Sequence, residues 1–131
     1  MDDYIFDPCG YSANGLAGPY YWTIHVTPES HCSYASFETT IPVKVFEHVA
    51  KDAHYDTFRE VIQKVIDVFQ PGKFSTTLFL RHTMKSHLQD IFLDKPIDGF
   101  RHRDRIHHSL GRWELVFSHF EKQAKPILTD R

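Results

Sequence analysis

The chain has 131 residues, 41% of them hydrophobic, which suits a single domain that folds without disulfides or structural metals. A formal net charge of −2 excludes a general electrostatic attraction to nucleic acid or to an anionic membrane. Two cysteines, Cys9 and Cys32, are too few for a disulfide framework, no apolar stretch approaches the roughly 20 residues that span a bilayer, and the acidic N-terminus has no signal-peptide pattern. We therefore expect a cytoplasmic protein with reduced thiols.

The first third of the chain predicts short strands separated by turns. Residues 3–6 form a first strand, and residues 8–15 are rich in glycine and asparagine, so we expect turns there. Residues 19–27 alternate as a strand does, with His25 on the face opposite to Trp22. Residues 33–40 predict the next strand.

The remainder predicts one clear helix and three more strands. Apolar residues recur at helical spacing over 55–69, and Pro71-Gly72 ends this helix. The preceding residues 43–54 add a short helix. The further strands are predicted at 73–81, 99–107 and 112–121, the last two as a hairpin that turns near Gly111.

This order of elements indicates the α+β class, as an antiparallel β-sheet with helices packed on one face. Several strands carry apolar or aromatic groups on both faces, so we expect a partner layer to cover the second face. Residues 1–131 are predicted to be one partial domain.

Two blocks near the start are distinctive. Residues 6–12 read Phe-Asp-Pro-Cys-Gly-Tyr-Ser, and residues 21–29 read Tyr-Trp-Thr-Ile-His-Val-Thr-Pro-Glu. They closely resemble segments of eukaryotic S-adenosylmethionine decarboxylases, and the likeness continues through residues 33–39 and 68–79. The chain resembles the C-terminal part of that proenzyme.

The resemblance implies one half of a two-repeat α/β/β/α sandwich. It implies pyruvoyl-dependent decarboxylation of S-adenosylmethionine for spermidine and spermine synthesis, with a pyruvoyl cofactor that acts as an electron sink. In this family the proenzyme forms the cofactor by cleaving itself before an internal serine.

The resemblance assigns self-processing to Ser12 and His25. A serine hydroxyl donates a hydrogen bond to a developing oxyanion, and a neutral imidazole accepts a proton. Without the flanking blocks, Ser12 would be an ordinary turn serine and His25 a surface residue of a strand.

Substrate binding is assigned by the same resemblance to Phe6 and Glu29. The ring of Phe6 would stack on adenine, and the carboxylate of Glu29 would accept both ribose hydroxyls. The alternatives are core packing for Phe6 and a solvated charge for Glu29.

Glu38, Phe79 and Trp113 match, the last loosely, a buried acidic pocket where some family members bind putrescine. A diamine fits such a pocket because buried carboxylates need a positively charged partner. Further acidic residues of that pocket have no counterpart in this sequence.

Ten histidines raise the question of a metal site, and His102, His107 and His108 lie close together in the sequence. No histidine or cysteine spacing typical of zinc is present, so we predict no metal.

The serine that becomes the pyruvoyl group is expected to lie outside these residues. The chain would then need the N-terminal half, or a homologous subunit, for activity. Two alternatives stay open: a non-catalytic regulatory paralogue and an inactive truncated fragment. A Ser12/His25 or Cys9/His25 hydrolase is a third interpretation, but the sequence offers no Gly-x-Ser-x-Gly turn and no orienting acid beyond Glu29.

Overall fold

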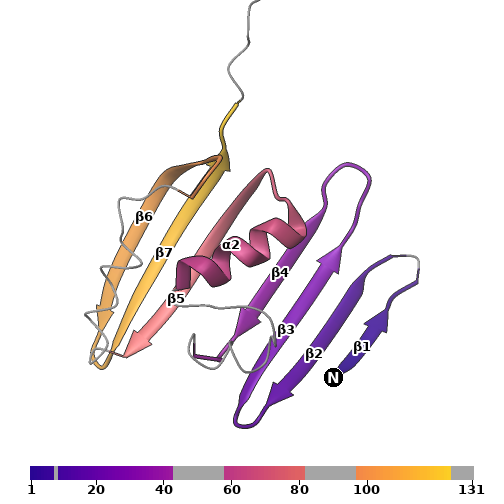
Figure 1. The fold of residues 1–131 in the computed structure, drawn as a ribbon, viewed down its shortest axis with the longest axis horizontal. Helices are drawn as coiled ribbons and strands as arrows, with labels where there is room; N and C mark the ends of the chain where they lie inside the picture. The colour runs from indigo at the N-terminus through magenta and orange to yellow at the C-terminus, as the bar shows by residue number, and fades with distance from the viewer. Residues whose placement is uncertain (8, 43–57, 82–96, 125–131) are drawn as a thin grey trace, which may run out of the picture. The chain divides into compact units, whose positions relative to one another are not determined.

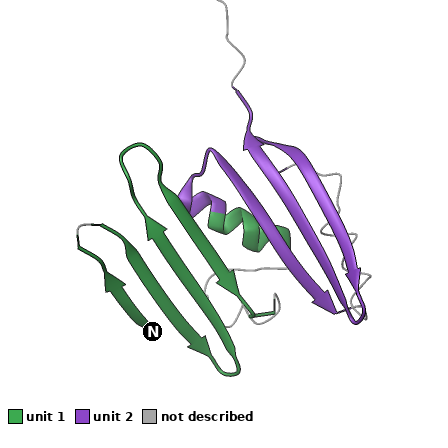
Figure 2. Cartoon of the chain, turned by 180° about the vertical axis from the view of Figure 1, so that it is seen from behind, with its two compact units in different colours: residues 1–65 green, residues 66–131 purple. Residues whose placement is uncertain are grey.

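The structure is a computed structural model and describes residues 1–7, 9–42, 58–81 and 97–124 (Figure 1). Its chain divides into two compact units, residues 1–65 and 66–131 (Figure 2). Each unit contains one antiparallel sheet among the described residues. The α+β class is therefore confirmed, with the strands distributed over two sheets.

The first unit holds a four-stranded meander whose strands pair in chain order. Its strands are β1 (Asp2–Ile5), β2 (Tyr11–Ala17), β3 (Tyr20–Thr27) and β4 (Tyr34–Thr39). Pro28 follows β3 directly, and because proline has no backbone N–H it cannot extend the ladder.

The prediction of turns at residues 8–15 is wrong from Tyr11 onward, because β2 begins there. Gly15 lies inside this strand, opposite Trp22 of β3. A Cβ atom at position 15 would overlap the indole of Trp22, so the glycine allows the ring to lie against the strand. Glycine here serves close packing within a sheet and not a turn.

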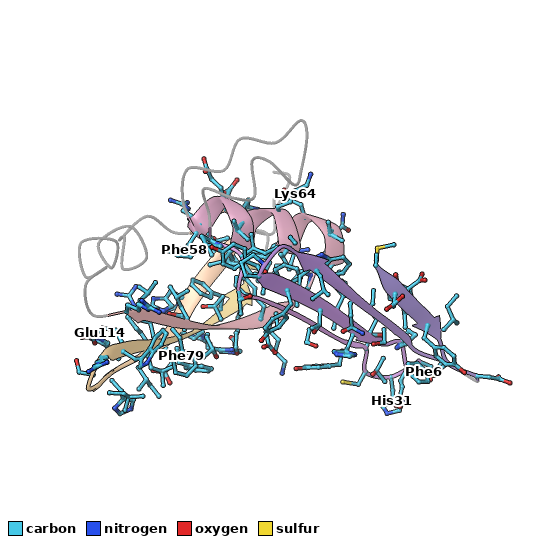
Figure 3. The ribbon with its side chains drawn as sticks, turned by 90° about the horizontal axis from the view of Figure 1, so that it is seen from below. Phe6, His31, Phe58, Lys64, Phe79 and Glu114 are labelled. Carbon is cyan, nitrogen blue, oxygen red and sulfur yellow. The ribbon has the colours of Figure 1, made fainter. Side chains whose placement is uncertain are left out.

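The helix α2 (Phe58–Phe69) contains the boundary between the units. Its apolar residues recur as predicted, and Ile66 is buried, whereas Lys64 is exposed and points outward (Figure 3). Gln70 ends the helix with a φ of 48° while its N–H donates to the carbonyl of Ile66 at 2.7 Å. The helix predicted at 43–54 and the start predicted at residue 55 lie outside the described residues.

The second unit holds a three-stranded sheet in the order β5-β7-β6. Its strands are β5 (Lys73–Arg81), β6 (Phe100–Leu110) and β7 (Trp113–Lys122). Gly111 takes a φ of 63° in the tight turn between β6 and β7, which confirms the predicted hairpin.

One face of this second sheet is packed. Phe74 stacks on Phe120 with ring centroids 4.8 Å apart and meets Phe100 edge-on at 5.0 Å. Leu80 and Val116 are nearly fully buried. This side of the sheet therefore has the close packing of a core.

Among the described residues, no helix combines the length and the apolar character that crossing a bilayer requires.

Candidate functional site

The face of the first sheet that carries His25 is polar. Residues directly opposite one another in antiparallel strands point to the same side. The register aligns Ser12 of β2, His25 of β3 and Ser36 of β4 in one row across the sheet. Two residues further along the strands, the next row contains Glu38. The fold thus brings together three of the residues predicted from sequence, Ser12, His25 and Glu38.

Ser12 and His25 are in direct contact. The hydroxyl Oγ of Ser12 lies 3.0 Å from Nδ1 of His25. In the imidazole tautomer protonated at Nε2, Nδ1 accepts the hydrogen of this hydroxyl. Such a pair can move a proton between the hydroxyl and the ring, and the hydroxyl can turn to donate to a developing negative charge. Within the described residues, no carboxylate contacts His25.

Sequence reasoning did not identify Tyr21, which lies on this same face of β3. Its hydroxyl donates a hydrogen bond of 2.5 Å to Oε1 of Glu38. This bond, together with some desolvation and the negative charge of Glu38, raises the pKa of the Tyr21 phenol above 10.0. The strand alternation predicted Tyr21 on the same face as His25, but only the pairing of β3 with β4 revealed its partner.

Phe6 follows the end of β1 and is 49% exposed (Figure 3). Its N–H donates to the carbonyl of Gly10 at 2.9 Å, and Gly10 has a φ of 130° that other residues rarely adopt. The ring of Tyr4 meets that of Phe6 edge-on, with centroids 4.7 Å apart. The ring is therefore held from one side and remains partly accessible, as a stacking residue needs to be.

Glu29 lies in the loop after β3. One of its carboxylate oxygens is 3.6 Å from Nε2 of His31, and its backbone carbonyl accepts a hydrogen bond from the Ser33 hydroxyl at 3.1 Å. The Glu29 side chain is 49% exposed. The backbone is thus fixed by Ser33 while the carboxylate remains open to a ligand.

The three residues matched to a putrescine pocket are not all in one sheet. Glu38 belongs to β4, whereas Phe79 and Trp113 belong to β5 and β7 of the second sheet. Phe79 is 57% exposed, and Trp113 is covered in part by the guanidinium of Arg81 at 5.8 Å from its ring. A shared pocket for these residues stays a prediction.

Two of the β6 histidines, His102 and His107, contact other side chains. His102 stacks on Phe120 at 4.8 Å, and Nε2 of His107 lies 2.6 Å from a carboxylate oxygen of Glu114. Over the ranges that the structure describes, no three histidine, cysteine or acidic side chains form a group that could hold a metal ion.

Sequence reasoning also missed Glu114, whose side chain is fully buried. The same carboxylate oxygen that meets His107 accepts a hydrogen bond of 2.7 Å from the Ser109 hydroxyl. A signal was present, because Glu114 shares the strand alternation of the buried Val116 and so had to face the core.

The chain matches the family model for adenosylmethionine decarboxylase over residues 1–121. The S-adenosylmethionine decarboxylase proenzyme of Xenopus laevis is 40% identical over 123 residues, which cover 93% of this chain and 33% of that protein. The proenzyme of Dictyostelium discoideum is 33% identical over 128 residues, covering 97% of this chain and 31% of the relative.

A solved structure shares the fold. The crystal structure of the Trypanosoma brucei AdoMetDC-delta26 monomer superposes with a TM-score of 0.71 at 26% identity, covering 93% of this chain and 46% of that one. The chain spans about a third of the length of the curated relatives it matches. By the extent of these matches, the chain belongs to the adenosylmethionine decarboxylase family.

Proposed function

We propose that this chain supplies substrate-binding and self-processing residues to a pyruvoyl-dependent decarboxylase of S-adenosylmethionine, for polyamine synthesis. The observation that carries the proposal is the contact of 3.0 Å between the Ser12 hydroxyl and Nδ1 of His25. The match to the family over residues 1–121 supports it.

Ser12 and His25 act as a proton-handling pair in self-processing. At Nδ1, His25 takes a proton from the segment that cleaves itself. The Ser12 hydroxyl then turns to donate to the oxygen of that segment on which negative charge develops. The β2–β3 register holds both groups opposite one another, so little conformational entropy is lost when they act together.

Phe6 and Glu29 bind the nucleoside part of the substrate in this proposal. The partly exposed ring of Phe6 stacks on adenine, and the open carboxylate of Glu29 accepts both hydrogens of the ribose diol. Putrescine binding near Glu38, Phe79 and Trp113 is a further proposal.

The half-buried hydroxyl of Ser12 and the exposed imidazole of His25 fit a site for a pyruvoyl group, because they offer a hydrogen-bond donor and a proton acceptor on one face. When bound, that group withdraws electrons from the substrate as carbon dioxide leaves. We propose that its serine precursor comes from a part of the protein outside these residues, either an N-terminal half or a homologous subunit. The complete protein would form the two-repeat sandwich and work in the cytoplasm.

The test is to produce this chain together with the N-terminal segment of the Xenopus laevis proenzyme. Two readouts are followed: self-cleavage by mass spectrometry, and carbon dioxide release from carboxyl-labelled S-adenosylmethionine. We expect Ser12→Ala and His25→Gln each to slow cleavage by about 10²–10⁴-fold.

Ser36→Ala is the matched control, since Ser36 lies opposite His25 on the other side of β3. It should cleave at the wild-type rate. Unchanged cleavage in both Ser12→Ala and His25→Gln would refute the assignment of the pair. Normal binding without cleavage or turnover in the wild-type assembly would support the regulatory paralogue instead.

A further inference from the structure

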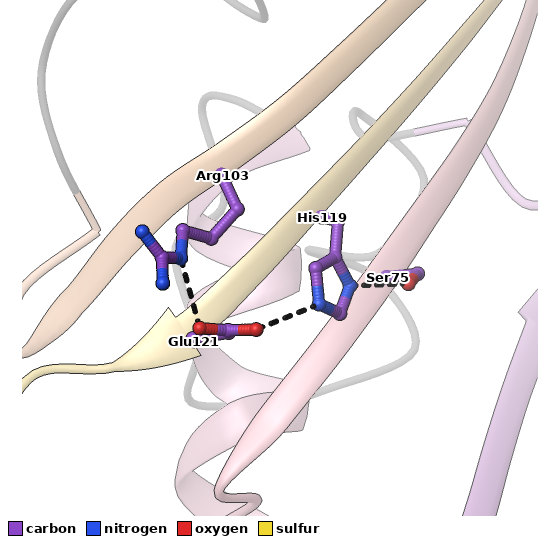
Figure 4. Close-up of polar contacts among 4 residues, drawn as sticks. All are labelled: Ser75, Arg103, His119 and Glu121. Carbon is purple, nitrogen blue, oxygen red and sulfur yellow. Dashed lines mark hydrogen bonds and ion pairs between the residues drawn. The ribbon is translucent and has the colours of Figure 1, made fainter.

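A second serine–histidine contact lies in the other unit. Ser75 of β5 stands directly opposite His119 of β7, and its Oγ is 2.9 Å from Nδ1 of His119 (Figure 4). The geometry repeats that of Ser12 and His25, although the two pairs are on different sheets. Nothing in the proposed decarboxylase function uses this second pair.

The second pair has a carboxylate behind it. Oε1 of Glu121, two residues further along β7, lies 3.6 Å from Nε2 of His119 (Figure 4). One ring nitrogen therefore faces the hydroxyl and the other faces a carboxylate. This is the order of roles in serine–histidine–acid sites, where the acid orients the ring and stabilises the imidazolium that forms.

The carboxylate is itself anchored. Nε of Arg103 donates a hydrogen bond of 2.9 Å to Oε2 of Glu121. Arg103 is the extra residue of a β-bulge, because the register of β6 against β7 shifts between His102 and Asp104. A bulge redirects a side chain that regular pairing would place elsewhere. Arg103 also lowers the pKa of Glu121, which keeps the carboxylate ionised.

The hydroxyl is accessible. Ser75 is exposed, and the side chains of His119 and Glu121 are 29% and 43% exposed. A small molecule can therefore approach Oγ from solvent while the ring stays behind it.

We propose that Ser75 is an activated nucleophile that accepts an acyl group from an activated carboxylic ester, with His119 as its general base. Glu121 and Arg103 act as positioning residues. Oγ attacks the carbonyl carbon, and its proton passes to Nδ1 of His119. The bond from carbon to the leaving oxygen then breaks, so the products are an acyl ester on Ser75 and a phenol or alcohol that recovers the proton from His119.

The donor class follows from the surroundings. β7 is the central strand, so its backbone N–H groups pair with β5 and β6, and the proposal assigns no oxyanion donor to them. We therefore choose a donor whose leaving group departs readily, as a phenolate does, because such a donor needs the least stabilisation of the oxyanion.

The test treats the full chain with 4-nitrophenyl acetate after the exposed thiols of Cys9 and Cys32 have been blocked by alkylation. Peptide mass mapping then follows acetylation of each serine with time. Ser33 is the reference, because it is exposed and its hydroxyl bonds a backbone carbonyl and no histidine. We expect Ser75 to be acetylated at least about tenfold faster than Ser33, within the range that general-base catalysis provides.

His119→Gln should reduce the Ser75 rate to that of Ser33, and Ser75→Ala should remove the label. Glu121→Gln should lower the rate in part, whereas Arg103→Lys, which keeps the charge, should preserve more activity than Arg103→Gln.

Equal rates at Ser75 and Ser33, or a Ser75 rate unchanged by His119→Gln in protein with native circular dichroism, would overturn the proposal. Either result would leave the roles of Ser12 and His25 untouched.

Discussion

Each of the two sheets holds a serine and a histidine in directly opposite positions, and the two contacts are almost equal in length. Ser12 meets His25 at 3.0 Å in the first sheet, and Ser75 meets His119 at 2.9 Å in the second. Register alone accounts for both, since directly opposite side chains lie about 5 Å apart at Cβ, within reach of a short hydroxyl and a ring.

The surroundings of the two histidines differ. The row of His25 ends in another serine, Ser36, whereas His119 faces Glu121, which is held by Arg103. The first pair is therefore suited to passing a proton to and from an outside group. In the second pair, Glu121 can orient the ring of His119 and compensate the positive charge of its imidazolium. The proposed chemistry of the two pairs therefore differs because their neighbouring side chains differ.

The second sheet also buries a carboxylate, and its removal gives the largest expected effect on stability. Glu114 is fully buried and joined to His107 at 2.6 Å and to Ser109 at 2.7 Å. Glu114→Ala removes the acceptor of these two contacts, so we expect a loss of about 2–4 kcal/mol in the free energy of unfolding, measured in urea. Glu121→Ala is the control, and its exposed carboxylate should cost much less. Equal losses would mean that burial does not distinguish the two acids.

The stability of the first sheet depends instead on a glycine, Gly15, against which Trp22 packs. Gly15→Ala forces the indole of Trp22 off β2, and overpacking of this kind costs about 1–3 kcal/mol. The change should lower the midpoint of thermal unfolding and, through the shared β2–β3 register, weaken the Ser12–His25 contact. Gly72→Ala is the matched control, because a Cβ there meets open space. A Gly15→Ala protein as stable as Gly72→Ala would contradict the close packing of Trp22 on β2.

The smallest effects on stability are expected from changes in pH. They occur at acidic pH for the second sheet and at basic pH for the first. The lowered pKa of Glu121, below 4.5, contributes stability that is present above the unfolded value and is lost as pH falls through the folded value. The raised pKa of Tyr21, above 10.0, contributes stability that is present below the unfolded value and is lost as pH rises through the folded value. Carboxyl chemical shifts and phenolate absorbance, each followed against pH, measure the two groups.

Each titration has its own control. Arg103→Gln should return the titration of Glu121 toward 4.5, because the guanidinium is the main cause of the shift. Glu38→Gln should return the pKa of Tyr21 toward 10.0. Because the chain has six tyrosines, the loss of absorbance in Tyr21→Phe identifies the part of the signal that belongs to Tyr21. A pKa that does not move in either variant would rule out the contact as its cause.

The sequence predicted most strands well because alternation and turn residues are local signals. The strand predicted at residues 73–81 agrees with β5 at both ends, and Gly111 marked the hairpin. The failure at Tyr11–Gly15 has a physical reason: the glycine-rich stretch resembles a turn, and only Trp22 on the neighbouring strand explains a glycine inside β2. The decarboxylase family was likewise recognised from residues 6–12 and 21–29, and the match over residues 1–121 confirms it.

By itself, then, the sequence determined the family, the α+β class and the chemical identity of the residues at the candidate site. Only the tertiary structure decided which of them meet. His25 and His119 each needed a strand register to acquire a serine, and His119 needed a bulge in β6 to acquire an anchored carboxylate. Pairing between strands depends on side chains far apart in the chain, so the local pattern that predicts a strand does not determine its neighbours.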